Sequence, residues 1–133
     1  MGMRRFLLVP VLLLISSLII VTACGKKEEK PQDNLQDAIK AAWKEKTPEH
    51  YLNLSLRYYE AGQYEKCIEA AQEALKLKSD FALAYNNICS AYNEMKMWDK
   101  GIEACQQALK IDPELQIARN NLNWAVTAKK SNK

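Results

Sequence analysis

The sequence contains few of the residues from which catalytic and nucleotide-binding sites are built. Its 133 residues include only one histidine and four glycines. A phosphate-binding loop and a dinucleotide-binding loop each require closely spaced glycines, and a catalytic triad requires a histidine with suitable partners. This inventory supplies neither. We therefore predict that the protein is not an enzyme and uses no cofactor and no metal.

The sequence also lacks a strong excess of charge of one sign. It carries 19 basic and 16 acidic side chains, and two of the basic ones, Arg4 and Arg5, lie in a segment that we expect to be removed. The remainder is close to neutral, whereas nucleic-acid binding requires a basic surface. We therefore expect no nucleic-acid partner. The length allows one small domain and excludes a multidomain enzyme.

The N-terminal part of the chain has the layout of an export signal. Arg4 and Arg5 precede an apolar stretch over residues 6–23, which is typical of a secretory signal peptide. Its end, Val-Thr-Ala-Cys at positions 21–24, resembles the lipobox of bacterial lipoproteins. The apolar stretch is only slightly shorter than the roughly 20 residues that a membrane-spanning helix needs. An uncleaved anchor is therefore the alternative.

The lipobox resemblance implies a signal peptide over residues 1–23 and lipidation of Cys24. In that family the cysteine receives acyl chains, such as palmitate, and two or more chains anchor a protein stably. The implied location is the bacterial cell envelope, with the lipid anchor in a membrane. Gly25 follows where an aspartate would favour inner-membrane retention. This favours the periplasmic side of the outer membrane in a Gram-negative cell.

A polar tether leads into the first helical pattern. Residues 25–33 have no large apolar side chain, so we expect a flexible tether over residues 24–33. Residues 34–47 carry apolar side chains at helical spacing, with Asp33 or Asn34 as the N-cap. Thr47 and Pro48 are expected to open the next helix. Trp43 lies on the apolar stripe, where core packing is favoured over a role in binding.

The rest of the chain contains an internal repeat. Residues 48–81 and 82–115 align without a gap, and 12 of the 34 positions are identical. Each unit contains two helical patterns separated by a short break. In the first unit the break contains Gly62, a residue suited to the end of a helix. The sequence therefore predicts two stacked helical hairpins.

The residues shared by the two units resemble the tetratricopeptide repeat. That family has a large residue early in its first helix, an aliphatic-small pair, a tyrosine one turn on, an aromatic residue that opens the second helix, and a later Ala-Leu pair. The matching residues are Tyr51 and Tyr85, Leu54-Ser55 and Ile88-Cys89, Tyr58 and Tyr92, Tyr64 and Trp98, and Ala74-Leu75 and Ala108-Leu109. The resemblance implies an all-α fold, a short α-α superhelix.

A third first-helix pattern follows from Pro113, with Asp112 as its expected N-cap, to about Lys129. Terminal repeats need a solvated outer face, which the lysine-rich end of the chain provides. We assign residues 34–47 to a lead-in helix, 48–81 and 82–115 to two repeats, and 116–133 to a capping helix and tail.

Three cysteines remain beside Cys24. Cys67, Cys89 and Cys105 each fall at a position where small side chains let helices pack closely. Their spacing does not resemble a zinc site, and an odd number excludes complete internal pairing. We favour buried free thiols, with one internal disulfide as the alternative in an exported protein.

In tetratricopeptide arrays the first helix of each pair lines a groove that usually holds a peptide segment of a partner. The resemblance places the following candidates on this inner face: Leu52, Asn53, Leu56, Tyr59, Glu60, Asn86, Asn87, Ser90, Asn93, Glu94, Asn120, Asn121 and Trp124.

Asn53, Asn87 and Asn121 recur at the same position of successive units. Because an amide side chain both donates and accepts hydrogen bonds, such a ladder can grip a peptide backbone without reading its sequence. The alternative is that these side chains bond between helices or are merely solvated. We predict peptide-binding roles for the ladder and for its neighbours Asn86, Asn120 and Tyr59.

These observations predict a lipid-anchored interaction scaffold. Its groove is expected to bind a peptide segment of a protein partner in the envelope. The alternative is a structural lipoprotein that self-associates as a homo-oligomer, with another copy filling the groove.

Overall fold

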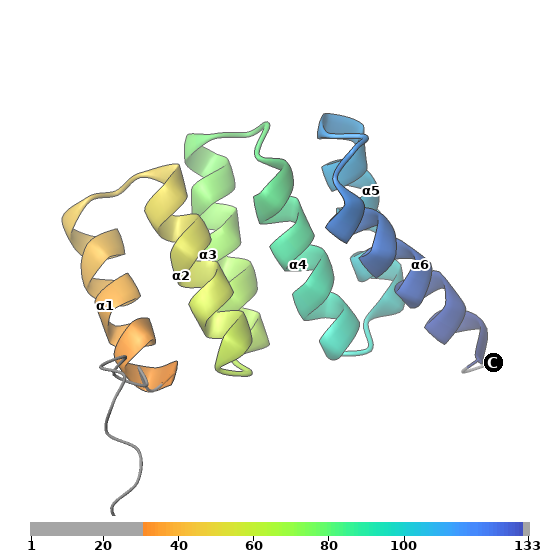
Figure 1. The fold of residues 1–133 in the computed structure, drawn as a ribbon, viewed down its shortest axis with the longest axis horizontal. Helices are drawn as coiled ribbons and strands as arrows, with labels where there is room; N and C mark the ends of the chain where they lie inside the picture. The colour runs from red at the N-terminus through yellow and green to blue at the C-terminus, as the bar shows by residue number, and fades with distance from the viewer. Residues whose placement is uncertain (1–30, 132–133) are drawn as a thin grey trace, which may run out of the picture.

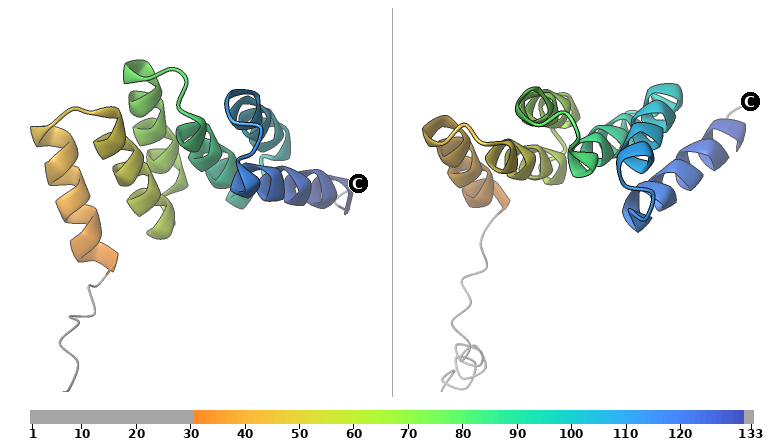
Figure 2. Two further views of the ribbon diagram at one scale, coloured as in Figure 1. Left: turned by 45° about the horizontal axis from the view of Figure 1, so that its top comes forward. Right: turned by 90° about the horizontal axis from the view of Figure 1, so that it is seen from above.

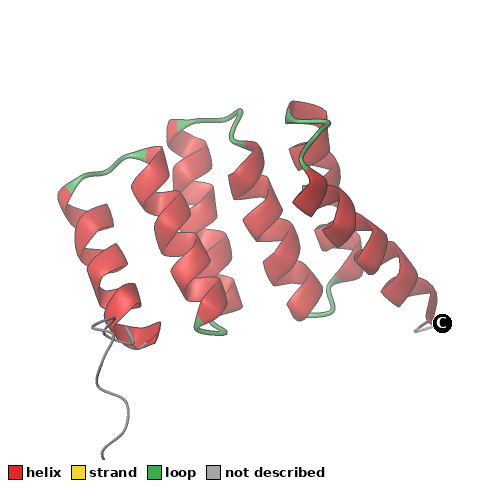
Figure 3. Cartoon of the chain, in the orientation of Figure 1, coloured by secondary structure: helices red, strands yellow, loops and turns green. Residues whose placement is uncertain are grey.

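The computed structural model describes residues 31–131. The predicted signal peptide, Cys24 and residues 24–30 of the predicted tether lie outside this range. The described part is entirely helical between short loops, which confirms the predicted all-α fold (Figure 3). Its helices are α1 (Pro31–Lys44), α2 (Pro48–Glu60), α3 (Tyr64–Leu77), α4 (Ala82–Glu94), α5 (Trp98–Ile111) and α6 (Gln116–Ser131).

The helices follow one another in chain order across the molecule, from α1 to α6 (Figure 1). α2 packs on α3 and α4 packs on α5, while α3 also contacts α4 and α5 contacts α6. Seen from above in Figure 2, α3 and α5 lie on one side of the row, and α2, α4 and α6 lie along the other. Because α2 also contacts α4 and α4 contacts α6, the first helices form one continuous face.

The helix bounds repeat with the sequence. α4 and α5 begin and end at the positions of the second unit that match the bounds of α2 and α3 in the first, and α6 begins at the corresponding position of a third unit. The capping of α2 is confirmed: Thr47 Oγ1 accepts a hydrogen bond from the His50 backbone N–H at 3.2 Å, and Pro48 occupies the first turn. A proline suits this place because it lacks the N–H that would be left unpaired there.

α6 begins at Gln116 rather than at Pro113, and the prediction of Asp112 as its N-cap is wrong. Asp112 instead ends α5, and its Oδ1 accepts a hydrogen bond from the Glu114 N–H at 3.0 Å. Aspartate competes with helix formation through such local bonds. The resulting turn carries the chain into α6.

The two hairpin turns use the same backbone conformation with different residues. Gly62 has φ +71°, and Lys96, at the same position of the second unit, has φ +58°. Both values lie in the left-handed region, which glycine enters freely and an L-residue enters at a cost. The turn geometry is therefore set by the helix packing, and Lys96 adapts to it.

The core is built mainly from small side chains. Cys67, Ala71, Cys89 and Cys105 are fully buried, and tyrosine rings pack around them with partial exposure. Small residues let helices approach to roughly 8–10 Å. The largest fully buried side chain is a polar one, Asn93. This arrangement confirms that the three cysteines occupy helix-packing positions.

α1 corrects the prediction for Trp43, which is 76% exposed rather than part of the core. The helix buries a narrow stripe, Leu35, Ala38 and Ala42, because it packs against α2 alone. Trp43 lies next to Ala42, about 100° around the helix from that stripe. The helix also begins at Pro31, before the expected cap at Asp33 or Asn34. Within residues 31–131, no helix is long and apolar enough to cross a membrane.

Candidate functional site

The face formed by α2, α4 and α6 carries two neighbouring hollows, which together form the groove. The first, here called the apolar hollow, has a volume of about 380 Å³. Three of its aliphatic side chains are unusually open to solvent: Leu56 is 40% exposed, Leu83 43% and Ile117 51%. The full lining is Glu49, Leu52, Asn53, Leu56, Leu83, Asn86, Asn87 and Ile117.

The second hollow, here called the aromatic hollow, lies toward the C-terminal ends of α2 and α4. Its volume is about 150 Å³, and its lining is Tyr59, Ser90, Asn93, Glu94, Asn121 and Trp124. Its residues come from all three first helices. A segment that lies along α4 would therefore contact both hollows.

The structure separates the three members of the asparagine ladder. Asn53 is exposed at the apolar hollow and makes no side-chain hydrogen bond with the other described residues. Asn87 donates its amide to Ser55 Oγ at 2.6 Å, which links α4 to α2. Asn121 donates to Asn86 Oδ1 at 3.0 Å and to Ser90 Oγ at 2.9 Å, which links α6 to α4. Asn87 and Asn121 thus hold successive units together.

The other predicted groove residues also differ in their placement. Asn86 is buried beneath the apolar hollow and accepts the bond from Asn121. Asn120 is exposed and accepts a bond from Gln116 Nε2 at 2.9 Å on its own helix. Neither Asn120 nor Glu60 lines a hollow; Glu60 instead forms an ion pair with Arg57 at 2.7 Å.

Tyr59 connects the two repeats across the aromatic hollow. Its hydroxyl donates a hydrogen bond to Glu94 Oε1 at 3.2 Å. Burial, together with the negative charge of Glu94, raises the pKa of the Tyr59 hydroxyl to about 12. The hydroxyl therefore stays protonated and keeps donating at neutral pH. On the opposite wall, the Trp124 ring meets Trp98 edge to face, with the ring centroids 5.3 Å apart.

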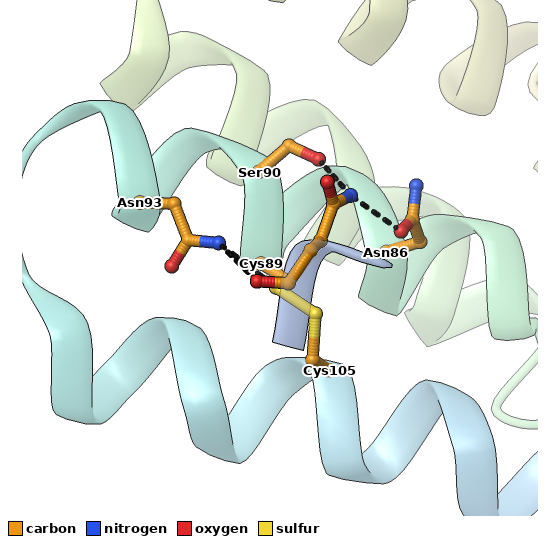
Figure 4. The surroundings of a disulfide bond; sticks show 6 residues. Asn86, Cys89, Ser90, Asn93 and Cys105 are labelled. Carbon is orange, nitrogen blue, oxygen red and sulfur yellow. Dashed lines mark hydrogen bonds between the residues drawn. A yellow bond between two sulfur atoms is a disulfide. The ribbon is translucent and has the colours of Figure 1, made fainter. Parts of the chain in front are cut away.

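A disulfide between Cys89 and Cys105 joins α4 to α5 behind the groove (Figure 4). The prediction of free thiols is therefore wrong for this pair. Cys105 faces Cys89 across the crossing of α4 and α5, with the Cα atoms 5.2 Å apart. That separation suits a disulfide. Cys67 is a buried free thiol, as predicted, and burial raises its pKa to about 12.

Asn93 connects the disulfide to the wall of the groove. Its amide donates to the Asn121 backbone carbonyl at 3.2 Å and lies 3.5 Å from Cys89 Sγ (Figure 4). Its Oδ1 has no hydrogen-bond partner in the described chain and faces Gly101, where an added Cβ would approach it to 2.1 Å. A Cβ at position 101 would therefore require the buried Asn93 side chain to move.

Sequence reasoning did not identify three residues of the apolar hollow, Glu49, Leu83 and Ile117. They recur at the second position of each successive unit. The same periodicity that identified the asparagine ladder could have identified them. Leu83 and Ile117 were missed because an apolar residue near the start of a helix is more often part of the core.

A larger hollow of about 590 Å³ lies among α1, α2 and α3, apart from the predicted groove residues. Trp43, Tyr51 and Tyr58 contribute to its lining, together with side chains of both charges. No group of three His, Cys, Asp or Glu side chains within residues 31–131 is placed to hold a metal ion.

Comparison with known proteins relates the chain to one repeat family. The model for the tetratricopeptide repeat matches residues 82–115. A crystal structure of the MamA protein matches with a TM-score of 0.69 and 26% identity, over 75% of this chain and 55% of that chain. This chain therefore spans about half the length of that MamA chain. No curated protein matches the chain in sequence.

Two further solved structures share the fold at lower identity. The first TPR domain of the human RPAP3 protein has a TM-score of 0.72 and 16% identity, over 77% of this chain and 81% of that domain. The Arabidopsis OM64 TPR domain has a TM-score of 0.68 and 14% identity, over 71% of this chain and 79% of that domain. Proteins with this fold are typically non-enzymatic scaffolds for protein–protein interaction. Residues 82–115 thus match the tetratricopeptide repeat in sequence, and the described helices have the fold of tetratricopeptide-repeat structures.

Proposed function

We propose that this protein is a lipid-anchored scaffold of the bacterial cell envelope whose groove holds a peptide segment of a protein partner. The observation that carries the proposal is the exposure of Leu56, Leu83 and Ile117 in one hollow on the first-helix face. The anchor rests on the lipobox at positions 21–24.

The apolar hollow offers a favourable surface for side chains of a partner. Covering the exposed half of a leucine or isoleucine contributes about 1 kcal/mol, since full burial contributes roughly twice that. Three such residues together supply a useful part of a binding free energy. Asn53 adds a free amide at the same hollow, which can both donate to and accept from a peptide backbone. This combination suits a segment with apolar side chains and an exposed main chain.

Photo-crosslinking in intact cells tests the groove. A photoreactive phenylalanine analogue replaces Leu56 in the groove or, as the matched control, Gln106 on the exposed side of α5. We expect a discrete crosslinked protein from position 56 and not from position 106. Equal crosslinking from both positions, or none from position 56, would overturn the groove as the binding surface.

The anchor is tested separately by labelling with a palmitate analogue. The wild-type chain should incorporate the label and partition with membranes, and Cys24→Ser should do neither. A labelled Cys24→Ser variant would contradict lipidation at that cysteine. Crosslinking from position 56 does not depend on this outcome.

Self-association is the second candidate function, because the same exposed aliphatic side chains could be covered by another copy of the chain. Sedimentation of the full chain in detergent micelles distinguishes the two. We expect a monomer at all concentrations. A crosslinked product of twice the chain mass from position 56, together with a concentration-dependent dimer, would favour self-association instead.

A further inference from the structure

We propose that the aromatic hollow binds a lysine or arginine side chain of the segment that the groove holds, while the apolar hollow binds an aliphatic or aromatic side chain of the same segment. The inference rests on the proposed function and specifies the chemistry of the partner. It follows from the composition, charge and spacing of the two hollows.

The aromatic hollow combines the two kinds of group that attract a basic side chain. Tyr59 from α2 and Trp124 from α6 place aromatic rings in its lining, and Glu94 from α4 supplies a carboxylate. A cation over an aromatic face gains roughly 0.5–2 kcal/mol. A charge-assisted hydrogen bond to a carboxylate is stronger than a neutral one. Trp124 is about half exposed, so its ring is open to a ligand.

The charge of the groove is one-sided. The linings of the two hollows, all within the described chain, include the carboxylates of Glu49 and Glu94 and no lysine or arginine. Glu94 forms no ion pair with any residue of the range 31–131, and its recorded partner is the Tyr59 hydroxyl. That hydroxyl, whose pKa is raised to about 12, is protonated at neutral pH and carries no charge. The charge of Glu94 is therefore available to a cation from outside.

Two basic side chains of the helices that form the groove are paired with other residues. Arg57 lies 2.7 Å from Glu60 on its own helix, and Lys129 pairs with Asp99. Neither side chain lines the aromatic hollow. Because the lining of this hollow in the described chain contains no lysine or arginine, a ligand can supply the complementary charge.

The size of the aromatic hollow fits one basic side chain. A cavity of about 150 Å³ can hold benzene, a molecule of six heavy atoms. The hollow has about that volume, and the butylammonium group of lysine has five heavy atoms. A single lysine end group therefore fits, whereas a larger folded element does not.

The distance between the hollows sets the spacing in the ligand. Leu83 at the start of α4 lines the apolar hollow, and Glu94 at its end lines the aromatic hollow. At about 1.5 Å per residue, these positions lie roughly 16 Å apart along the helix. An extended segment covers that distance in about five residues. The partner should carry a basic residue about five positions from an apolar one.

Titration with a small lysine analogue tests the aromatic hollow directly. The full chain in detergent micelles is labelled with ¹⁵N, and the indole signal of Trp124 is identified by its loss in Trp124→Phe. N-acetyl-lysine methylamide should shift this signal, with saturation at millimolar concentrations. N-acetyl-norleucine methylamide, which has the same stem without the charge, should not. Glu94→Gln, which keeps the shape of the side chain, should weaken the lysine response at least fivefold.

Two results of the titration would overturn the proposal. One is an equal response to the lysine and norleucine compounds, which would indicate apolar contact only. The other is a lysine response that Glu94→Gln leaves unchanged. Neither result bears on whether the apolar hollow binds a peptide, so the proposed function stays separately testable.

An array of random dodecapeptides tests both the groove as a peptide-binding site and the basic preference of the aromatic hollow. The full chain should retain peptides with a basic residue about five positions from a large apolar one. Leu83→Ser should lose these peptides, and Glu94→Gln should lose the basic preference. Retained peptides that need Leu83 but show no basic preference would overturn the present inference and leave the groove intact. Peptides that bind equally to Leu83→Ser would overturn the groove itself.

Discussion

Asn121 of α6 donates its side-chain amide to Asn86 Oδ1 of α4 at 3.0 Å, from one repeat unit to the preceding one. The same amide donates to Ser90 Oγ at 2.9 Å. Asn121, which the sequence places on the groove face, thus holds α6 against α4. Of the three ladder residues, Asn53 is the one whose side chain is exposed and makes no hydrogen bond within the described chain, so its amide is free for a ligand.

The members of the asparagine ladder should therefore differ in how much they contribute to the stability of the fold. Asn121→Ala leaves the buried Asn86 oxygen without its donor, which costs roughly 1–3 kcal/mol. Asn53→Ala removes an exposed side chain and should change the free energy of unfolding by less than about 0.5 kcal/mol. Both variants gain the same helix propensity, so each serves as control for the other. Urea unfolding measures the difference, and equal losses would contradict the assignment.

The two hairpin turns should respond in opposite directions to substitution. Gly62→Ala forces a side chain into a left-handed conformation and should destabilise the fold by about 1 kcal/mol. No neighbour lies within 4 Å of the added Cβ, so the cost is conformational. Lys96→Gly relieves the same conformation and should stabilise by about 0.5 kcal/mol, after the greater entropy of glycine in the unfolded chain is counted. Destabilisation by both variants would indicate that Lys96 makes a stabilising contact.

The Cys89–Cys105 disulfide should contribute substantially to stability. It closes a loop with a sequence separation of 16 residues, for which the chain-entropy model gives about 3 kcal/mol. A reductant should therefore lower the Tm of the wild-type chain by about 10–20 °C. The double variant Cys89→Ala, Cys105→Ala should have the lower Tm both with and without reductant. An unchanged wild-type Tm on reduction would show that the bond does not support the fold.

Alkaline pH should weaken the fold through Tyr59. Its pKa is about 12 in the folded state and about 10 in an unfolded chain, so the unfolded state loses its proton first. The stabilisation is present below about pH 10 and is lost as pH rises towards 12. The free energy of unfolding of Tyr59→Phe should fall less steeply over this range than that of the wild type. The raised pKa of Cys67 affects both proteins alike. Stability curves for the two proteins that run parallel would contradict this contribution.

The sequence predicted the helical pairs well because each position of the repeat occurs twice, once in each unit, and both copies show the same helical pattern. Tyr51 and Tyr85, for example, fall at the same register, and the bounds of the helices confirm the alignment of the two units. The cap at Thr47 was predictable because Thr-Pro at a helix start has a local physical cause.

The errors occurred where the outcome depends on a neighbouring helix. Trp43 is exposed because α1 packs on one helix only, which its own apolar stripe does not reveal. The pairing of Cys89 with Cys105 depends on which small positions face each other at a crossing. Likewise, the bonds made by Asn87 and Asn121 depend on Ser55, Asn86 and Ser90 of adjacent units. Periodicity places such residues on a face but does not select their partners.

The decisive quantity is the affinity of the groove for the partner segment recovered by crosslinking at position 56. Calorimetry compares the wild-type chain with Leu83→Ser in the apolar hollow and with Gln106→Ser on α5. Both substitutions lie at exposed positions, so the fold should be kept in each. We expect Leu83→Ser to raise the Kd about tenfold and Gln106→Ser to leave it unchanged. If Leu83→Ser binds as tightly as the wild type, or Gln106→Ser weakens binding equally, the partner does not bind in this groove.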